Sequence, residues 1–296
     1  MLIEALHKQS GIPIANLQWL AATASLRYKT YEIPKRNGGY RTIHHPSKAL
    51  KGVQRWVSKF LFRQLPIHES ATAYTKGTGI RKNAEAHSAT AFTLRMDFKD
   101  FFPSFDQQGV EEYLNLCNRQ FLMELSREDI EFVGNIVCRY GQLTIGAPSS
   151  PSLTNAMMYS FDRQVSELTE RRDLVYTRYA DDLFISSNTP NNLEDIPRII
   201  KDISSTFPFS SLNINDEKTT FLSRRYARRI TGLIITPQGD ISIGREKKRA
   251  IKAMVNSFKY GVLETHEIEQ LAGYIAYIRD VENSFYISLQ KKYGAV

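Results

Sequence analysis

The chain has 296 residues, of which 42% are hydrophobic and 24% are charged, and its formal net charge is +8. This composition excludes a disordered or fibrous protein, and the length suffices to bury a large core. The excess of positive charge favours a polyanionic partner. Two cysteines, Cys117 and Cys138, occupy apolar positions of helix-like segments, which predicts buried free thiols rather than a disulfide or a metal site.

The chain begins Met-Leu-Ile-Glu-Ala-Leu-His-Lys, which lacks the cationic segment and the following apolar segment of a secretion signal. No apolar run approaches the length that crosses a bilayer. We therefore expect a cytoplasmic protein that has no membrane partner.

The first hundred residues combine helices, one hairpin and one strand. Residues 13–26 and 49–65 have the three- and four-residue apolar spacing that is typical of helices. Between them, residues 31–43 contain Asn-Gly-Gly between two β-prone runs, which predicts a β-hairpin. Residues 91–98 are typical of a strand, and Asp97 lies at its end.

The remaining residues alternate irregularly between helical and β-prone segments. The predicted elements are a helix with a capping box at Ser126 and Asp129, a helix after Pro151, a hairpin at 174–187, a helix at 193–206, two short strands at 230–244 and a basic helical segment from Arg245. This order lacks βαβ regularity and predicts an α+β fold with an antiparallel sheet.

The most informative segment is Tyr179-Ala-Asp-Asp182, at the predicted tip of the second hairpin. Adjacent aspartates repel each other, so a fold that keeps both ionised needs positive charge nearby, most simply a divalent cation such as Mg²⁺. If strand 91–97 neighbours this hairpin, Asp97, Asp181 and Asp182 converge and can hold two metal ions for phosphoryl transfer. The alternative is a solvated strand end and an ordinary turn.

Five segments together resemble the motifs of reverse transcriptases, in the order of that family. They are Ile33–Ile43, similar to the fingers hairpin, and Met96–Pro103, Gly146–Pro151, Tyr179–Asp182 and Leu212–Thr219, similar to successive palm motifs. The resemblance covers roughly residues 30–250 and implies a right-hand polymerase with fingers, an antiparallel-sheet palm and a small helical thumb. It implies N-terminal helices and fingers at 1–90, a palm at 91–235 from which 116–145 return to the fingers, and a thumb at 236–296.

A closer resemblance is to bacterial retron reverse transcriptases. That group carries Asn-Ala-x-x-His before the first catalytic aspartate and Val-Thr-Gly after the palm, and this chain has Asn83–His87 and Ile230–Gly232 at those places. Ser242–Lys248 is also similar to the segment that opens the C-terminal helices of the group. Taken alone, Asn83 and His87 are also consistent with a helix cap and a packed histidine, which is the alternative to the retron motif.

The resemblance assigns catalysis and metal binding to Asp97, Asp181 and Asp182, with the backbone carbonyl of Phe98 as a further ligand. The implied cofactor is a pair of Mg²⁺ ions. The mutual repulsion of these carboxylates argues against a non-catalytic scaffold, which has no use for such a group.

The resemblance also outlines a site for the incoming dNTP. Phe102 matches the ring that excludes a ribose 2′-hydroxyl, although Phe101 and Phe102 are both consistent with core packing. Lys35 and Arg41 match the cations that grip the triphosphate, and a solvated hairpin is the alternative. Lys218 matches a palm lysine that can protonate the leaving pyrophosphate.

One nucleotide-site position departs from the family pattern. Many relatives have Pro-Gln before the glycine that corresponds to Gly146, whereas this chain has Thr144-Ile145. Ile145 cannot hydrogen-bond a sugar hydroxyl, although it can line the pocket through van der Waals contact. We therefore expect the chemistry to be retained and nucleotide discrimination to differ.

Two groups of residues are expected to bind RNA. Asn83 and His87 form the first, by resemblance to the retron motif. The second group is basic and comprises Arg245, Lys247, Lys248, Arg249 and Lys252. Such a face can follow the phosphates of a template–primer duplex or of structured RNA, and a solvated basic helix is the alternative.

The retron resemblance implies an RNA-directed DNA polymerase that copies a dedicated structured non-coding RNA. It implies priming from an internal guanosine 2′-hydroxyl, a branched RNA–DNA product, and a role in anti-phage defence with a separate effector protein. The segment from Arg245 leaves no room for an RNase H domain, so a host RNase H is expected to remove the template. The alternatives are another short bacterial reverse transcriptase, defence-associated or intron-derived, and a non-catalytic RNA-binding scaffold of the same fold.

Overall fold

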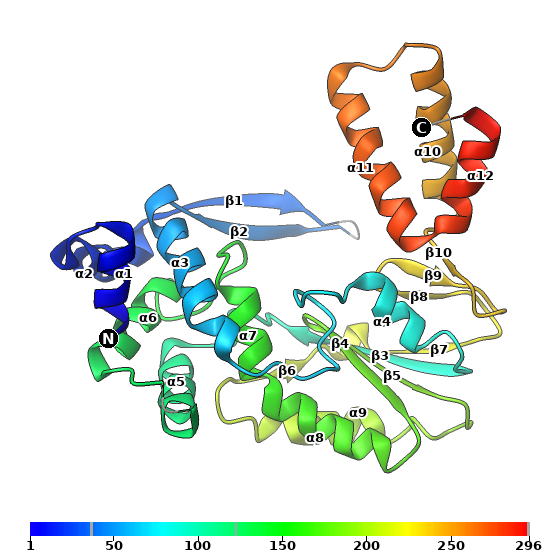
Figure 1. The fold of residues 1–296 in the computed structure, drawn as a ribbon. Helices are drawn as coiled ribbons and strands as arrows, with labels where there is room; N and C mark the ends of the chain where they lie inside the picture. Colours follow the sequence, from blue (N-terminus) through cyan, green and yellow to red (C-terminus); the bar gives the residue numbers. More distant parts are fainter. Residues whose placement is uncertain (36–37, 122, 295–296) are drawn as a thin grey trace.

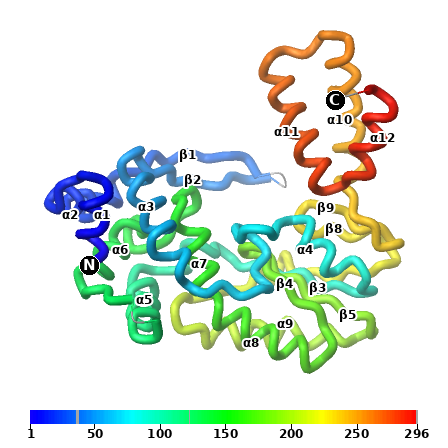
Figure 2. Tube along the Cα trace, viewed as in Figure 1, coloured from blue at the N-terminus to red at the C-terminus, as the bar shows by residue number. Residues whose placement is uncertain are grey.

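The computed structural model describes residues 1–35, 38–121 and 123–294. The described elements form an N-terminal helical block with a long β-hairpin, a central sheet flanked by helices, and a C-terminal helical bundle (Figure 1). The N-terminal block and the C-terminal bundle lie at opposite ends of the molecule (Figure 2). None of the described helices is long and apolar enough to cross a membrane.

The N-terminal block surrounds one end of the hairpin. Its elements are α1 (Leu2–Ser10), α2 (Ile14–Ala22), η1 (Ala24–Leu26), the hairpin strands β1 (Tyr28–Pro34) and β2 (Tyr40–Pro46), α3 (Lys48–Phe60), η2 (Phe62–Gln64), α5 (Gln107–Phe121) and α6 (Arg127–Val137). α6 packs against α1, α2 and α3 although it is distant from them in sequence. Ser126 and Asp129 form the predicted capping box at its start, which confirms that prediction.

The central sheet is antiparallel and has the strand order β4-β5-β3-β6, with β7 also paired to β3. Its strands are β3 (Phe92–Lys99), β4 (Val175–Tyr179), β5 (Asp182–Ser187), β6 (Asn213–Ile214) and β7 (Thr220–Ser223). The helices α7 (Ser150–Met157), α8 (Tyr159–Glu170) and α9 (Ile196–Ser205) bury their apolar faces in the same core as the sheet, and η3 (Asp216–Lys218) follows β6. The predicted α+β class with an antiparallel sheet is confirmed.

A second, smaller core joins the C-terminal bundle to the sheet. It contains side chains from α4 (Ile80–Ala86), β8 (Arg228–Ile230), β9 (Leu233–Ile235), α10 (Arg245–Lys259), α11 (Thr265–Val281) and α12 (Asn283–Tyr293), and β10 (Ile241–Ser242) pairs with β9. Phe184 of β5 belongs to this core, so the bundle rests on the central sheet through α4 and the β8–β10 sheet.

Three local expectations need correction or completion. The single helix predicted after Pro151 is divided into α7 and α8 at Met158, and the two strands predicted at 230–244 belong to a three-stranded sheet that begins at Arg228. The sequence patterns also missed α1 and α4, which are short. Cys117 and Cys138 are buried and free, as predicted, and burial raises the pKa of the Cys138 thiol to about 12.

Candidate active site

The central sheet brings the three predicted aspartates to one end of neighbouring strands. β3 pairs with β5 so that Asp97 lies directly opposite Asp182, and the Phe98 amide donates to the Asp181 carbonyl at 3.0 Å. β4 and β5 pair up to Tyr179 opposite Asp182, which leaves Ala180 and Asp181 in the turn. The expectation that the strand ending in Asp97 neighbours the acidic hairpin is therefore confirmed.

Two of the three carboxylates contact cationic side chains. Oδ1 of Asp97, which is almost fully buried, lies 2.6 Å from Nζ of Lys218. Oδ1 of Asp182 accepts from Arg95 Nη2 at 2.8 Å and from Arg95 Nε at 3.1 Å. Burial, followed by the charges of Asp182 and Asp97, raises the pKa of Asp181 to about 6. At Asp181, therefore, the nearby negative charges outweigh the nearby positive charges.

These carboxylates have the chemistry of a site for hard divalent cations. Their oxygens are the ligand type that Mg²⁺ prefers, and an added cation would offset the burial and the neighbouring negative charges that raise the pKa of Asp181. With the side chains oriented toward Arg95 and Lys218, the described residues contain no cluster of three or more His, Cys, Asp or Glu in a metal-holding arrangement. The donor set fits a metal ion, and the orientation of Asp97 and Asp182 is set by their cationic partners.

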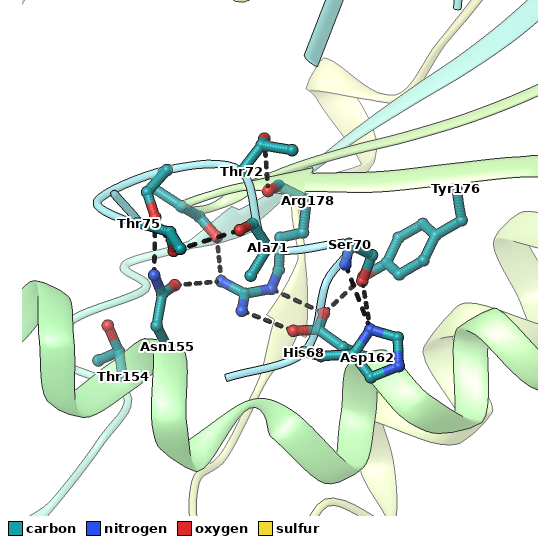
Figure 3. Close-up of polar contacts among 12 residues, drawn as sticks. His68, Ser70, Ala71, Thr72, Thr75, Thr154, Asn155, Asp162, Tyr176 and Arg178 are labelled. Carbon is teal, nitrogen blue, oxygen red and sulfur yellow. Dashed lines mark hydrogen bonds and ion pairs between the residues drawn. The ribbon is translucent and has the colours of Figure 1, made fainter. Parts of the chain in front are cut away.

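A buried ion pair joins Arg178, three residues before Asp181, to Asp162 (Figure 3). Neither Arg178 nor Asp162 exposes any side-chain surface, and two hydrogen bonds join them, Nη2 to Oδ2 at 2.6 Å and Nε to Oδ1 at 2.8 Å. The Tyr176 hydroxyl donates to Asp162 Oδ1 at 2.7 Å. The sequence analysis missed this pair. One local signal was present: Asp162 lies beside Phe161 on the apolar side of its helix, where an acidic residue is unusual.

The ion pair connects to the aspartate turn through the backbone. Arg178 Nη1 donates to the Ala180 carbonyl and to Asn155 Oδ1, each at 3.1 Å (Figure 3). Ala180 has φ 57°, a conformation that non-glycine residues adopt at some cost. Because Arg178 holds the carbonyl of this residue, it fixes the backbone that carries Asp181.

Residues 70–78 form a loop that runs beside β4. Ala71 forms a parallel bridge with Arg178. The Arg178 carbonyl accepts from the Thr72 amide at 2.8 Å and from the Thr72 hydroxyl at 3.1 Å, the second of which Figure 3 draws. The loop presents Tyr74, which is 60% exposed and has φ 58°. Partial burial and then the Asp181 charge raise the pKa of the Tyr74 hydroxyl, while the Arg41 charge acts in the opposite direction. Tyr74, which the sequence analysis missed, is thus electrostatically coupled to both the aspartate turn and the fingers hairpin.

The predicted nucleotide-site residues fall around this turn and hairpin. Phe101 is buried in the main core, whereas Phe102 is only half-buried and packs edge-on to Phe101 with ring centroids 5.4 Å apart. The structure therefore leaves Phe102 as the accessible member of the pair. Lys35 and Arg41 are exposed at the far end of the hairpin, on either side of its turn.

The loop that contains Ile145 and Gly146 contacts β2. The His44 amide donates to the Ile145 carbonyl at 2.9 Å, and Ile145 is half-buried. Gly146 has φ 111°, and a Cβ atom there would lie 2.7 Å from the His44 carbonyl oxygen. Glycine is required at this position because the backbone of β2 passes so close to the loop.

The two retron-like motifs meet at α4, inside the protein. Asn83 and His87 have no exposed surface, and Asn83 Oδ1 accepts from Thr72 Oγ1 at 2.9 Å. The two ring nitrogens of His87 each lie 2.7 Å from a hydroxyl, those of Ser186 and Thr177. Side chains without exposed surface cannot contact RNA in this conformation, so the predicted RNA contact of Asn83 and His87 finds no support here.

The second motif contacts the first residue of the same helix. Thr231 Oγ1 donates to the Ile80 carbonyl at 3.1 Å, in a tight β8–β9 turn where Thr231 has φ 45° and Gly232 has φ 82°. On the other side of α4, Arg81 Nη1 donates to the Asp280 carbonyl of α11 at 2.7 Å. The motif residues therefore join α4 to the central sheet and to the β8–β9 turn, and Arg81, outside both motifs, joins it to the C-terminal bundle.

The predicted basic group lies on α10, and its members differ in surroundings. Arg245 and Arg249 are exposed. Lys248 forms an ion pair with Glu282, and its ammonium lies 5.2 Å from the centre of the Phe285 ring. Lys252 also lies over Phe285, at 5.6 Å, and Lys247 lies over Tyr277, at 5.1 Å. Part of the basic group therefore packs within the bundle.

Comparison with known proteins gives consistent results. Residues 33–260 match the family model described as reverse transcriptase (RNA-dependent DNA polymerase). Retron Ec83 reverse transcriptase of Escherichia coli is 33% identical, over 93% of this chain and 89% of that protein. Retron Ec86 reverse transcriptase of Escherichia coli is 32% identical, over 98% and 89%. Retron Mx162 reverse transcriptase of Myxococcus xanthus is 30% identical, over 93% and 63%.

Solved structures share the fold at much lower identity. Apo telomerase from Candida tropicalis superimposes with a TM-score of 0.54 at 13% identity, over 91% of this chain and 60% of that one. Telomerase from Candida albicans, solved with a fragment of telomeric RNA, gives 0.52 at 12% identity, over 89% and 56%. This chain thus spans less than two thirds of either telomerase chain, and the likeness identifies the right-hand polymerase fold.

Proposed function

This chain belongs to the retron reverse transcriptases and is an RNA-directed DNA polymerase, and we propose that it copies a dedicated structured non-coding RNA into DNA that stays joined to its template RNA. Synthesis starts on an internal guanosine 2′-hydroxyl and gives a branched product. The observation that carries this proposal is the similarity to retron enzymes over nearly the whole chain, together with the meeting of Asn83, His87 and Thr231 at α4.

The proposed metal site consists of Asp97, Asp181 and Asp182, with the Phe98 carbonyl, and it takes two Mg²⁺ ions. Two observations support this assignment: Asp97 lies opposite Asp182 on the paired strands β3 and β5, and the pKa of Asp181 is raised. The ions would activate the attacking hydroxyl and stabilise charge on the transferring phosphoryl group. The chain itself keeps the turn rigid through Arg178, so the carboxylates are positioned before substrate binds.

The proposed dNTP site extends from the aspartate turn to the fingers hairpin. Lys35 and Arg41 grip the triphosphate, and the half-buried ring of Phe102 excludes the ribose 2′-hydroxyl. Ile145 and Gly146 line the pocket through the loop that contacts β2.

Lys218 is the proposed proton donor to the leaving pyrophosphate. Its ammonium is half-exposed and contacts Asp97, so it lies beside the carboxylates and also reaches solvent. A positioned lysine next to the reacting phosphates can transfer a proton as the pyrophosphate leaves.

The proposed division of the chain is N-terminal helices and fingers at 1–90, palm at 91–235 and thumb at 236–296, with 116–145 returning to the fingers. The packing of α6 on α1, α2 and α3 supports that return. The α10 face with Arg245, Lys247, Lys248, Arg249 and Lys252 follows the phosphates of the template–primer duplex. The exposure of Arg245 and Arg249 supports this role for those two residues.

The proposed cellular role is anti-phage defence together with a separate effector protein, and a host RNase H removes copied template. Plating of phage on cells that carry the complete locus tests the first part. The variant with Asp181→Asn and Asp182→Asn should lose protection together with DNA synthesis.

The decisive experiment analyses the nucleic acid that copurifies with the protein from its native expression context. Samples are treated with RNase, DNase and a 2′–5′ debranching enzyme. A short DNA that is covalently joined to RNA and shifts on debranching is the expected result. The Asp181→Asn, Asp182→Asn protein, purified in parallel, should carry RNA without DNA. Unbranched DNA in the wild-type sample would overturn the 2′-hydroxyl priming proposal.

A further inference from the structure

The N-terminal block contains a strongly basic groove of about 530 Å³. It lies where β1 begins, β2 ends and α3 begins. Its basic lining residues are Arg27, Lys29, His45, Lys48, Lys51 and Arg55. No acidic side chain lines it, and among the described residues no ion pair joins any of these cations to a carboxylate.

The groove cations are arranged along one side of a helix. Lys48, Lys51 and Arg55 are spaced by three and four residues on α3, so they form one stripe. Ser47 caps the start of this helix, and the unpaired amides of its first turn add partial positive charge at the same place. Neighbouring cations repel one another, so this arrangement is stabilised by a ligand with several negative charges along its length.

Exposed aromatic rings flank the cations. Trp19 is 63% exposed, and the Arg27 guanidinium lies 4.2 Å from the centre of its ring. Tyr140 is 65% exposed, and Arg139 lies over both its ring, at 4.7 Å, and the ring of Tyr28, which lines the groove. Cations interleaved with exposed rings suit a strand whose phosphates and unpaired bases are both accessible.

The groove is distant from the proposed triphosphate cations. Tyr28 pairs with Pro46 at the groove, and Pro34 pairs with Tyr40 next to the hairpin turn. Six residues of extended strand separate these pairs, which corresponds to about 20 Å. A dNTP held at Lys35 and Arg41 therefore cannot also occupy the groove.

We propose that this groove is a second nucleic-acid site, which binds a single-stranded stretch of RNA outside the polymerase cleft. Lys48, Lys51 and Arg55 neutralise successive phosphates, and Trp19 and Tyr140 stack on bases. This proposal rests on the proposed function only for the identity of the natural RNA. The cations and rings of the groove would bind any single strand.

The test uses the full chain and a fluorescent 30-nucleotide oligouridylate, which has unpaired bases throughout. The variant with Lys48→Gln, Lys51→Gln and Arg55→Gln is compared with a control that removes three exposed cations elsewhere, Lys8→Gln, Arg119→Gln and Arg127→Gln. In the groove variant, we expect Kd at 0.1 M salt to rise about tenfold or more, and the slope of log Kd against log salt to fall by about 2. Tyr140→Ala should weaken binding without changing that slope.

A second measurement separates the groove from the polymerase cleft. Extension of a short DNA primer on an RNA template with a four-nucleotide overhang should proceed at the wild-type rate in the groove variant. Equal Kd and equal salt slope in the groove and control variants would overturn the proposal, as would competition for oligouridylate by dNTPs alone. Neither readout depends on a branched product, so this site and the priming proposal can fail independently.

Discussion

Two buried arginines, one in the central sheet and one in the β8–β10 sheet, are compensated in different ways. Arg178, on β4, forms a two-bond ion pair with Asp162 and has no exposed surface. Arg228, on β8, is 1% exposed and donates to the hydroxyls of Thr90 and Thr93 and to a backbone carbonyl, while its Nε has no partner in the structure. Burial, and then the charge of Arg224, lowers the pKa of Arg228.

The two arginines belong to regions with different tasks. The Arg178 network supports the turn that carries Asp181, so its geometry must be fixed, and paired charges specify geometry strongly. The Arg228 network continues through Thr93, Ser186 and His87, which are neutral groups that anchor α4. A guanidinium paired with a carboxylate therefore lies beside the proposed catalytic residues, and a guanidinium bonded only to uncharged groups lies near the C-terminal bundle.

The largest expected effect comes from removing one charge of the ion pair. Asp162→Asn leaves Arg178 buried without a counterion and should cost about 3–5 kcal/mol of unfolding free energy. It also loosens the Ala180 carbonyl, so kcat should fall roughly ten- to hundredfold. Urea denaturation and primer extension measure these quantities. If the double variant Asp162→Asn, Arg178→Met lost as much unfolding free energy as the two single variants together, the two residues would not act as a unit.

Adjacent residues of β4 allow a matched comparison of the two networks. Tyr176 donates to the carboxylate of Asp162, whereas Thr177 contacts His87 on the other face of the strand. Tyr176→Phe should cost about 2 kcal/mol because a bond to a charged group is lost, and Thr177→Val about 1 kcal/mol. Urea denaturation of both variants measures their losses of unfolding free energy. A larger loss for Thr177→Val than for Tyr176→Phe would contradict the assignment of the stronger bonds to the Asp162 network.

The pH dependence of stability isolates the neutral network. Burial, and secondarily the charge of Arg228, lowers the pKa of His87 to about 3, against 6.5 for a free histidine. Between these values the unfolded chain binds the extra proton, so stability is lost as pH falls below the unfolded value. By pH 5.5 the loss from this residue should reach about 1.4 kcal/mol. Denaturation of wild type and His87→Gln at pH 7.5 and 5.5 measures it, and equal pH dependence in both proteins would exclude the effect.

The smallest expected effect is that of Arg228→Met. This change removes a buried cation that has no carboxylate partner, so stability should stay within about 1 kcal/mol of wild type. Thermal unfolding at neutral pH checks this. A loss as large as that of Asp162→Asn would show that hydroxyls compensate a buried guanidinium as well as a carboxylate does.

The sequence by itself determined most of the local elements, and it placed Asp97 at a strand end and Asp181 and Asp182 at a hairpin tip. Apolar spacing, the capping box at Ser126 and the β-prone runs around Asp181 depend on contacts between residues that are close in the chain, so they can be read without the fold. The motif order identified the family, which the comparisons confirm. The resemblance assigned the nucleotide-site ring to Phe102, but the local pattern alone does not separate Phe102 from Phe101, because both rings are consistent with core packing.

Only the tertiary structure decided which polar residues lie inside and which cations gather on the surface. Arg178 and Arg228 have no local signal that separates them from exposed arginines, and their partners lie on other elements. Asn83 and His87 are buried because α4 packs against β4 of the central sheet and against the β8–β10 sheet. The groove of Lys48, Lys51 and Arg55 forms only when the ends of the hairpin meet α3. Burial and charge compensation depend on long-range packing, which local sequence patterns do not encode.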